Sequence, residues 1–264
     1  GGLRQDLERC RKGLPDFERG ETFEIGLHDL RDRLQFSGRL YGREEEISRI
    51  MEIFDRVSRG PAELLFVAGY SGVGKTSLVH EVNRPIVARR GAFVSGKFDL
   101  PQRNVPYAAF VQAFRDMIRQ LLAQPEDVLD LWRTRFHEAM GPNAQVIIDV
   151  IPEVELVTGP QPSASELPPE ERQGRFVLVF RNFLKALARE DHPIVVHLDD
   201  LQWADQASLD LLEVLLEDVE LRYALFIGSY RDNEVPPTHA LMHTVEALQK
   251  KKRPLQTLTL MPLA

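Results

Sequence analysis

The chain has 264 residues and a single cysteine, Cys10, and 43% of its residues are hydrophobic, which is the composition of an ordinary globular protein. Its formal net charge of −7 argues against a broad nucleic-acid-binding surface, and one cysteine excludes a disulfide framework. With neither a membrane-length apolar run nor a signal-peptide pattern in the sequence, we expect a cytoplasmic protein, or a fragment of one, that contacts no membrane and no nucleic acid.

In the first third of the chain, the sequence predicts a linker, a helix, a strand and a second helix. Residues 1–38 mix charged and apolar residues without a clear period, which indicates a linker. Residues 44–57 place Ile50 and Phe54 at helical spacing behind three glutamates. The short apolar run 63–70 predicts a strand buried on both faces. A helix follows over 77–89, and Pro85 is expected to bend or end it.

The remainder of the chain alternates expected strands and expected helices. The strands are expected over residues 91–98, 193–200, 223–231 and 255–261. The helices are expected over residues 106–123, 126–140, 143–151, 175–189, 206–219 and 238–250, with a long loop rich in proline and serine over 156–170. Such alternation predicts crossover connections, and therefore an α/β fold with a mainly parallel sheet flanked by helices.

A glycine-rich loop follows the first expected strand and precedes a helix. Its residues, GYSGVGKT, fit the phosphate-binding pattern G-x-x-x-x-G-K-[ST] at every fixed position. Glycines let backbone N–H groups turn toward a phosphate, Lys75 would reach the β- and γ-phosphates, and the Thr76 hydroxyl would bind Mg²⁺. The alternative is a plain glycine turn with a solvated lysine. The predicted nucleotide-binding residues are Gly69, Tyr70, Ser71, Gly72, Val73, Gly74, Lys75, Thr76 and Ser77.

Two aspartates end the apolar strand expected over 193–200, where a phosphate-loop protein needs a carboxylate for its metal ion. Asp199 is predicted to hold Mg²⁺, and Asp200 to activate the attacking water as a general base. The alternative is that both merely begin a surface loop. A third polar group, Arg231, follows the next strand and could bind the γ-phosphate through its guanidinium. The alternative for Arg231 is an ion pair with Asp232 or Glu234.

With the glycine-rich loop, the two aspartates and Arg231 in this order, the chain resembles the signal-transduction ATPases with numerous domains, the STAND class of P-loop proteins. More narrowly, it resembles the ATPase module that follows a serine/threonine kinase domain in large bacterial signalling proteins, including hybrid sensor histidine kinases. The matching segments cover most of residues 39–235 and are RLYGREEEISRIMEIFDRVSRG, GYSGVGKTSLVHEV, GAFVSGKFDLPQRNVPYAAFVQAF, NAQVIIDVIPEVE, HLDDLQWADQASLDLL and IGSYRDNEV.

The resemblance implies an additional-strand ATPase (ASCE) sheet with strand order 5-1-4-3-2. It also implies a switch that is closed with ADP and open or self-associated with ATP. Residues 1–38 would link an upstream kinase domain, and a sensor or effector would lie downstream. We expect residues 39–264 to form the ATPase domain without the family's helical lid and winged-helix segment. The contacts that this lid makes with the nucleotide in the family are therefore not expected here.

The resemblance also places Tyr41, Gly42 and Arg43 beside the adenine, although a local turn would equally explain Gly42. For the other matching residues, more than one role is considered. Trp203, in the LQWAD segment with Asp205, is expected to pack, and Arg175 could serve a partner's nucleotide or only a helix surface. Lys97, Asp99 and Gln102 could face the γ-phosphate or a neighbouring subunit, or stand in solvent.

Three functions follow from these residues. The first is an ATP-hydrolysing signalling switch, with slow turnover because Asp200 is shorter than the glutamate common in P-loop hydrolases. The second is a nucleotide-gated scaffold or oligomerisation module with negligible turnover. The third, a small-molecule kinase, lacks the basic lid that such enzymes carry over the phosphates.

Overall fold

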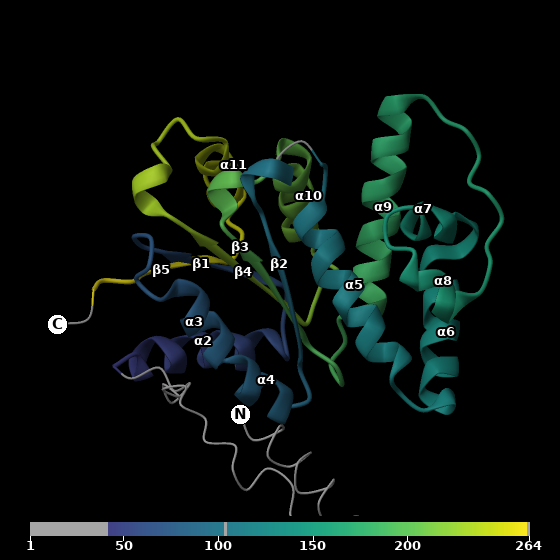
Figure 1. Cartoon of the computed structure of the whole chain (residues 1–264), viewed down its shortest axis with the longest axis horizontal. Helices are drawn as coiled ribbons and strands as arrows, with labels where there is room; N and C mark the ends of the chain where they lie inside the picture. Colours follow the sequence, from purple (N-terminus) through teal and green to yellow (C-terminus); the bar gives the residue numbers. More distant parts are fainter. Residues whose placement is uncertain (1–41, 103–104, 263–264) are drawn as a thin grey trace, which may run out of the picture. The chain divides into compact units, whose positions relative to one another are not determined.

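A five-stranded, all-parallel sheet forms the centre of the protein (Figure 1), seen in a computed structural model that describes residues 42–102 and 105–262. The strand order is β2-β3-β4-β1-β5, which confirms the predicted order 5-1-4-3-2. The expected linker 1–38 and Tyr41 lie outside the described residues. The strands are β1 (Glu63–Ala68), β2 (Ala92–Lys97), β3 (Ile194–Asp199), β4 (Ala224–Tyr230) and β5 (Leu255–Thr259).

Helices cover both faces of the sheet, and this explains the unbroken apolar runs of the central strands. Along β1, Leu64 and Phe66 face one core, while Leu65 and Val67 face the other. Figure 1 shows α2, α3 and α4 on one face and α5, α10 and α11 on the other. Their bounds are α2 (Glu44–Val57), α3 (Lys75–Glu81), α4 (Asn83–Ala88), α5 (Ala108–Leu122), α10 (Gln206–Glu217) and α11 (Ala240–Lys250).

A helical insertion between α5 and β3 packs beyond α5, on the side away from the sheet (Figure 1). Aromatic rings join it to α5. The ring centroids of Phe114 and Phe180 lie 5.3 Å apart, edge to face, and those of Phe114 and Phe183 lie 5.8 Å apart. No helix in the described ranges is long and apolar enough to cross a membrane. The insertion comprises α6 (Glu126–Met140), α7 (Ala144–Ile148), α8 (Glu153–Thr158) and α9 (Pro169–Leu187).

Short 3₁₀ turns complete the elements, and one of them follows the two aspartates that end β3. Within residues 42–102 and 105–262 these turns are η1 (Leu100–Gln102), η2 (Gly141–Asn143), η3 (Leu201–Trp203) and η4 (Asp232–Glu234). Turns η1, η3 and η4 therefore follow β2, β3 and β4 at the carboxyl edge of the sheet.

The expected helix over 77–89 is two helices, α3 and α4, which meet at Val82. The break comes before Pro85 because a proline ring clashes with the carbonyl four residues earlier and offers no N–H to it. Pro85 instead occupies the first turn of α4, where its missing N–H has no helical partner to lose.

The expected loop over 156–170 is shorter than predicted at both ends. Residues 156–158 belong to α8, and α9 begins at Pro169 rather than at Arg175. Proline is well suited to the first position of a helix because that residue needs no N–H donor there. Residues 170–174 are exposed and show no apolar period, so the sequence pattern could not reveal this turn.

Replacing Gly96 with alanine is expected to destabilise the protein strongly, because β2 and α5 touch there backbone to backbone. A Cβ atom on Gly96 would lie 1.8 Å from the carbonyl oxygen of Ala109, so α5 must move off the sheet. We expect a loss of about 1–3 kcal/mol or more in the free energy of unfolding, measured by denaturant titration. Gly174→Ala is the matched control, since a Cβ there meets nothing within 4 Å. Equal stability of the two variants would contradict this packing.

Candidate functional site

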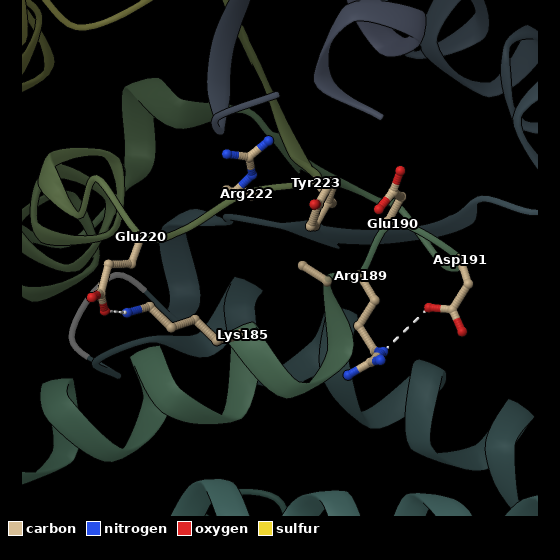
Figure 2. Close-up of a pocket in the computed structure, with 8 residues that line it drawn as sticks. Lys185, Arg189, Glu190, Asp191, Glu220, Arg222 and Tyr223 are labelled. Atoms are coloured by element: carbon tan, nitrogen blue, oxygen red, sulfur yellow. Dashed lines mark hydrogen bonds and ion pairs between the residues drawn. The ribbon is translucent and has the colours of Figure 1, made fainter. Parts of the chain in front are cut away.

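A charged pocket of about 610 Å³ opens at the amino ends of the strands (Figure 2). It lies between the end of α9 and the segments that precede β3 and β4. Two ion pairs lie within the pocket, with Lys185 Nζ 2.9 Å from Glu220 Oε2 and Arg189 Nε 3.2 Å from Asp191 Oδ1. Ligands of open α/β sheets bind at the carboxyl ends of the strands. The phosphate-binding pattern lies at that opposite edge, and so does the candidate site.

The glycine-rich loop joins β1 to α3. Gly72 and Gly74 have φ angles of 79° and 99°, a backbone region that side chains disfavour, so these glycines are required for the turn. The Lys75 ammonium donates hydrogen bonds to the carbonyls of Gly69 (2.8 Å) and Tyr70 (2.9 Å). An ammonium has three donors, so one remains for a phosphate oxygen. Burial lowers the pKa of Lys75, and the nearby aspartates Asp200 and Asp199 oppose that effect.

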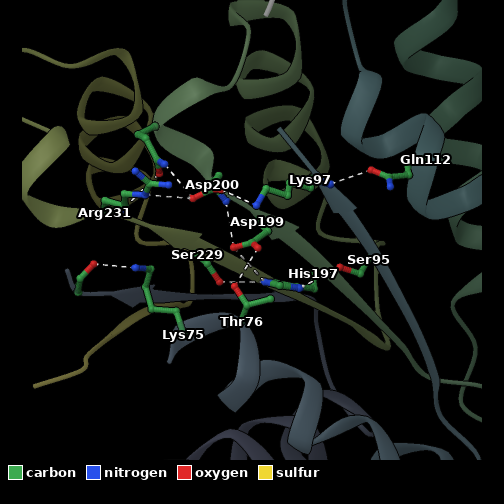
Figure 3. Close-up of polar contacts among 12 residues, drawn as sticks. Lys75, Thr76, Ser95, Lys97, Gln112, His197, Asp199, Asp200, Ser229 and Arg231 are labelled. Carbon is green, nitrogen blue, oxygen red and sulfur yellow. Dashed lines mark hydrogen bonds and ion pairs between the residues drawn. The ribbon is translucent and has the colours of Figure 1, made fainter. Parts of the chain in front are cut away.

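Thr76 and Asp199, predicted to bind Mg²⁺, are brought together from 123 residues apart in the chain. The Thr76 hydroxyl donates a hydrogen bond of 3.0 Å to Asp199 Oδ2 (Figure 3). Mg²⁺ prefers hard oxygen ligands and takes one or two carboxylates together with substrate phosphates. A hydroxyl and a buried carboxylate, beside the predicted phosphate-binding loop, fit that requirement.

Asp200 lies at the centre of a cluster of cations. Its backbone is in the left-handed region with φ of 56°, a conformation that aspartate tolerates better than most residues. Lys97 Nζ is 3.0 Å from Asp200 Oδ2, and Gln202 donates to Oδ1 at 2.9 Å. Burial alone would raise the pKa of Asp200. The hydrogen bonds from Gln202 and Lys97, and the charges of Lys97 and Arg231, outweigh it and hold that pKa below its usual value.

Arg231 lies between Asp200 and the predicted alternative partner Glu234. Its Nε is 3.6 Å from Asp200 Oδ1, and its Nη1 is 2.7 Å from Glu234 Oε1. The guanidinium also lies over the ring of Trp203, 4.8 Å from the ring centre, a geometry that favours a cation–π contact. The pairing with Glu234 agrees with the alternative reading, while the contact with Asp200 keeps Arg231 within the predicted site.

Sequence reasoning missed a buried histidine beneath the aspartates. His197 is fully buried, and its ring nitrogens lie 3.0 Å from Ser95 Oγ and 2.9 Å from Ser229 Oγ (Figure 3). This chain of hydrogen bonds joins β2, β3 and β4 just below the carboxyl edge. Burial lowers the pKa of His197 to about 3, so its ring is neutral. A histidine inside an otherwise apolar strand was the available signal.

The predicted adenine-side residues are only partly described, since Tyr41 is outside the described ranges. Gly42 has φ of 75°, and its N–H bonds to Glu44 Oε1, as in a local turn. Arg43 is buried and pairs with Glu46 at 2.8 Å. It also donates a hydrogen bond to the carbonyl of Met261, after β5. Arg43 therefore ties the start of α2 to the segment that follows β5.

The P-loop also contacts that segment. Leu260 N–H bonds to the carbonyl of Ala68 at 2.8 Å, and a Cβ on Gly69 would lie 2.8 Å from the Leu260 carbonyl. The first residue of the predicted phosphate-binding loop thus lies against the residue that follows β5. Arg175 lies apart from these contacts, since it binds the backbone carbonyl of Ser165 in the loop before α9 at 2.8 Å.

Comparisons with known proteins agree with this geometry. Residues 39–227 match the family model described as "AAA ATPase domain". The chain is 36% identical over 195 residues to hybrid signal transduction histidine kinase G of Dictyostelium discoideum, which covers 74% of this chain. It is 22% identical over 187 residues to histidine protein kinase 1 of Candida albicans, covering 65% of this chain. The chain spans only 6% and 7% of these two relatives.

Among solved structures, two show a partial similarity to this chain. Cdc6p from Pyrobaculum aerophilum is similar with a TM-score of 0.43 and 15% identity, over 83% of this chain and 45% of that one. The ORC2 protein of Aeropyrum pernix, solved in ADPNP–ADP complexes, has a TM-score of 0.41 and 16% identity, over 84% and 48% of the two chains.

Proposed function

Because the chain belongs to the AAA ATPase domain family, we propose that it binds ATP with Mg²⁺ at the carboxyl edge of its sheet and hydrolyses the ATP slowly. The observation that carries this proposal is the hydrogen bond between Thr76 and Asp199. It joins the phosphate-binding loop to the strand that carries the two aspartates, so one phosphate group can be reached from both.

Each residue of the cluster has a distinct part in the proposed reaction. The loop from Gly69 to Gly74 wraps the phosphates, and Lys75 neutralises the β- and γ-phosphate oxygens. Thr76 and Asp199 would hold Mg²⁺, which when bound neutralises charge that develops on the phosphate oxygens. Arg231 would bind a γ-phosphate oxygen from the side of β4.

Asp200 would accept the proton of the attacking water. A carboxylate whose pKa is held low is a weak base, and Lys97, Gln202 and Arg231 hold the pKa of Asp200 low. This supports slow turnover. The same observation favours the second candidate function, a nucleotide-gated scaffold with negligible turnover. The two differ only in whether phosphate is released.

We further propose that the domain is a regulatory module of a multidomain signalling protein of the STAND class. The kinase relatives support this because the matching region is a small part of each. The partners would be the other domains of the parent protein, with a kinase domain upstream, a sensor or effector downstream, and self-association when ATP is bound.

Thr76→Val is expected to remove the effect of Mg²⁺ on ATP binding, because it deletes the metal-facing oxygen and keeps the branched shape of the side chain. The lost contact to a charged group is worth about 1.5–3 kcal/mol, so ATP affinity in Mg²⁺ should fall at least about tenfold. A fluorescent ATP analogue titrated with Mg²⁺ and with EDTA measures this effect. Thr134→Val, on the exposed face of α6, is the control. Unchanged affinity for Mg²⁺-ATP in Thr76→Val would contradict the proposed metal site.

A further inference from the structure

The 3₁₀ turn η3 is packed onto the strand next to the one that it follows. Its first residue, Leu201, is 1% exposed. A Cβ atom on Gly228, in β4, would lie 2.4 Å from Leu201 Cδ1. Glycine at this position of β4 therefore leaves the room that the leucine side chain occupies. The turn that begins at the end of β3 is thus held against β4.

The second residue of the turn, Gln202, bridges the ends of the two strands. It is 4% exposed. Its Nε2 donates a hydrogen bond of 2.9 Å to Asp200 Oδ1, and its Oε1 accepts one of 3.2 Å from the backbone N–H of Arg231. A side-chain amide has one donating end and one accepting end, and here each end has a matching partner. Gln202 therefore fixes the backbone from which the Arg231 side chain extends.

The third residue, Trp203, contacts the side chain of the same arginine. The central carbon of the Arg231 guanidinium lies over the tryptophan ring, 4.8 Å from its centre. The backbone N–H of Trp203 bonds to the carbonyl of Asp200 at 3.0 Å, which ties the tryptophan to the end of β3. Consecutive residues of one turn thus hold both the backbone and the side chain of Arg231.

The contact with Trp203 leaves the N–H groups of the guanidinium available to an anion. Nη1 lies 2.7 Å from Glu234 Oε1, and Nε lies 3.6 Å from Asp200 Oδ1 (Figure 3). A guanidinium has five N–H donors, so donors remain for a phosphate oxygen. An aromatic ring attracts the cation through its π electrons, and this attraction uses none of those donors.

We propose that Trp203 is a positioning residue, which holds the guanidinium of Arg231 where a γ-phosphate would lie and so makes the domain bind ATP more tightly than ADP. The inference rests on the proposed function, in which Arg231 binds a γ-phosphate oxygen. ADP has no γ-phosphate, so the contact between Trp203 and Arg231 strengthens the binding of ATP alone. We expect Trp203→Leu to lower ATP affinity about three- to tenfold and to leave ADP affinity unchanged.

Titration calorimetry of the full chain in Mg²⁺, with ADP and with a non-hydrolysable ATP analogue, measures the two affinities. Trp203→Phe keeps an aromatic face and should recover most of the affinity for the analogue. Trp132→Phe is the matched control, because Arg135 lies over Trp132 at 4.9 Å in α6. This control should leave both affinities unchanged. A tryptophan with a purely structural role would change the two affinities by the same factor.

The fluorescence of Trp203 is a second readout, and it leaves Trp203 in place. The sequence has two tryptophans, so the tryptophan emission of Trp132→Phe comes from Trp203. Indole emission responds to nearby charge, and a γ-phosphate bound by Arg231 would bring negative charge close to the ring. The ATP analogue should therefore shift the emission, whereas ADP should not. Arg231→Met in the same background should abolish the shift.

Two results would overturn the inference. One is a ratio of ATP-analogue to ADP affinity that is the same in Trp203→Leu as in the unaltered chain, and the other is Trp203 emission that is the same with both nucleotides. Thermal unfolding shows whether each variant has folded, and the fluorescence result decides if Trp203→Leu has not. Failure of the proposed function is recognised separately, since the unaltered chain would then bind neither nucleotide.

Discussion

Replacing Lys75 with methionine is expected to weaken ATP binding by about a hundredfold or more. Methionine keeps the unbranched apolar stem, which is buried, and removes the ammonium. Loss of one partner of a buried, hydrogen-bonded charge pair typically costs about 2–5 kcal/mol, and each 1.4 kcal/mol is about tenfold in affinity. Equilibrium titration with a fluorescent ATP analogue measures the change.

Lys251→Met is the matched control for this experiment. It removes the same charge from the exposed end of α11, where Lys251 pairs with Glu213 at 3.1 Å. Its ATP affinity should equal that of the unaltered chain. Lys75→Met with intact affinity would exclude the phosphate-binding role of the glycine-rich loop, provided that thermal unfolding shows both variants folded.

Asp200→Asn is expected to lower turnover by about 10²–10⁴-fold, the usual contribution of general acid–base catalysis. Asparagine keeps the size of the side chain and its contact with Gln202, yet cannot take a proton from water. ATP binding should persist, because in the proposed site Lys75 and Thr76 would contact the phosphates and Mg²⁺ independently of Asp200. Phosphate release under single-turnover conditions, with ATP affinity measured in parallel, separates the two effects.

The control for this variant is Asp210→Asn, on the exposed side of α10, which should leave turnover unchanged. Persistent turnover in Asp200→Asn would move the base to another group. If the unaltered chain bound ATP and released no phosphate, the scaffold function would replace the hydrolytic one.

The strands could be predicted from the sequence because the sheet is covered on both faces. The three central strands, β1, β3 and β4, are short runs of buried and mainly apolar residues between polar turns, and the sequence shows each of them as such a run. The boundaries of the helices were harder to predict. Residues 170–174, at the start of α9, are exposed and therefore show no apolar pattern. Helix α8 has only six residues, which is too short for a clear helical period. Hydrophobic periodicity contains no information about such turns.

The position of the candidate residues could be predicted where one segment contains the whole pattern, as in the loop that ends at Thr76. It could also be predicted at a strand end, since β3 ends at Asp199 and Asp200 follows it. The pairing of Lys97 with Asp200 was not predicted. It depends on β2 lying beside β3 in the register that sets Lys97 opposite Asp199. The contacts of His197 with Ser95 and Ser229 need the same knowledge of neighbouring strands, which local sequence does not supply.

The contacts at the end of β5 have a mechanical consequence. Among the strands of the described residues, β5 is hydrogen-bonded to β1 alone. The segment after β5 lies against Gly69 and accepts a hydrogen bond from Arg43. Tension applied to the chain beyond β5 would therefore be transmitted first to Gly69 and to the start of α2, before it reached β4, β3 or β2. A pull of that kind would distort the phosphate-binding loop while the centre of the sheet stayed intact.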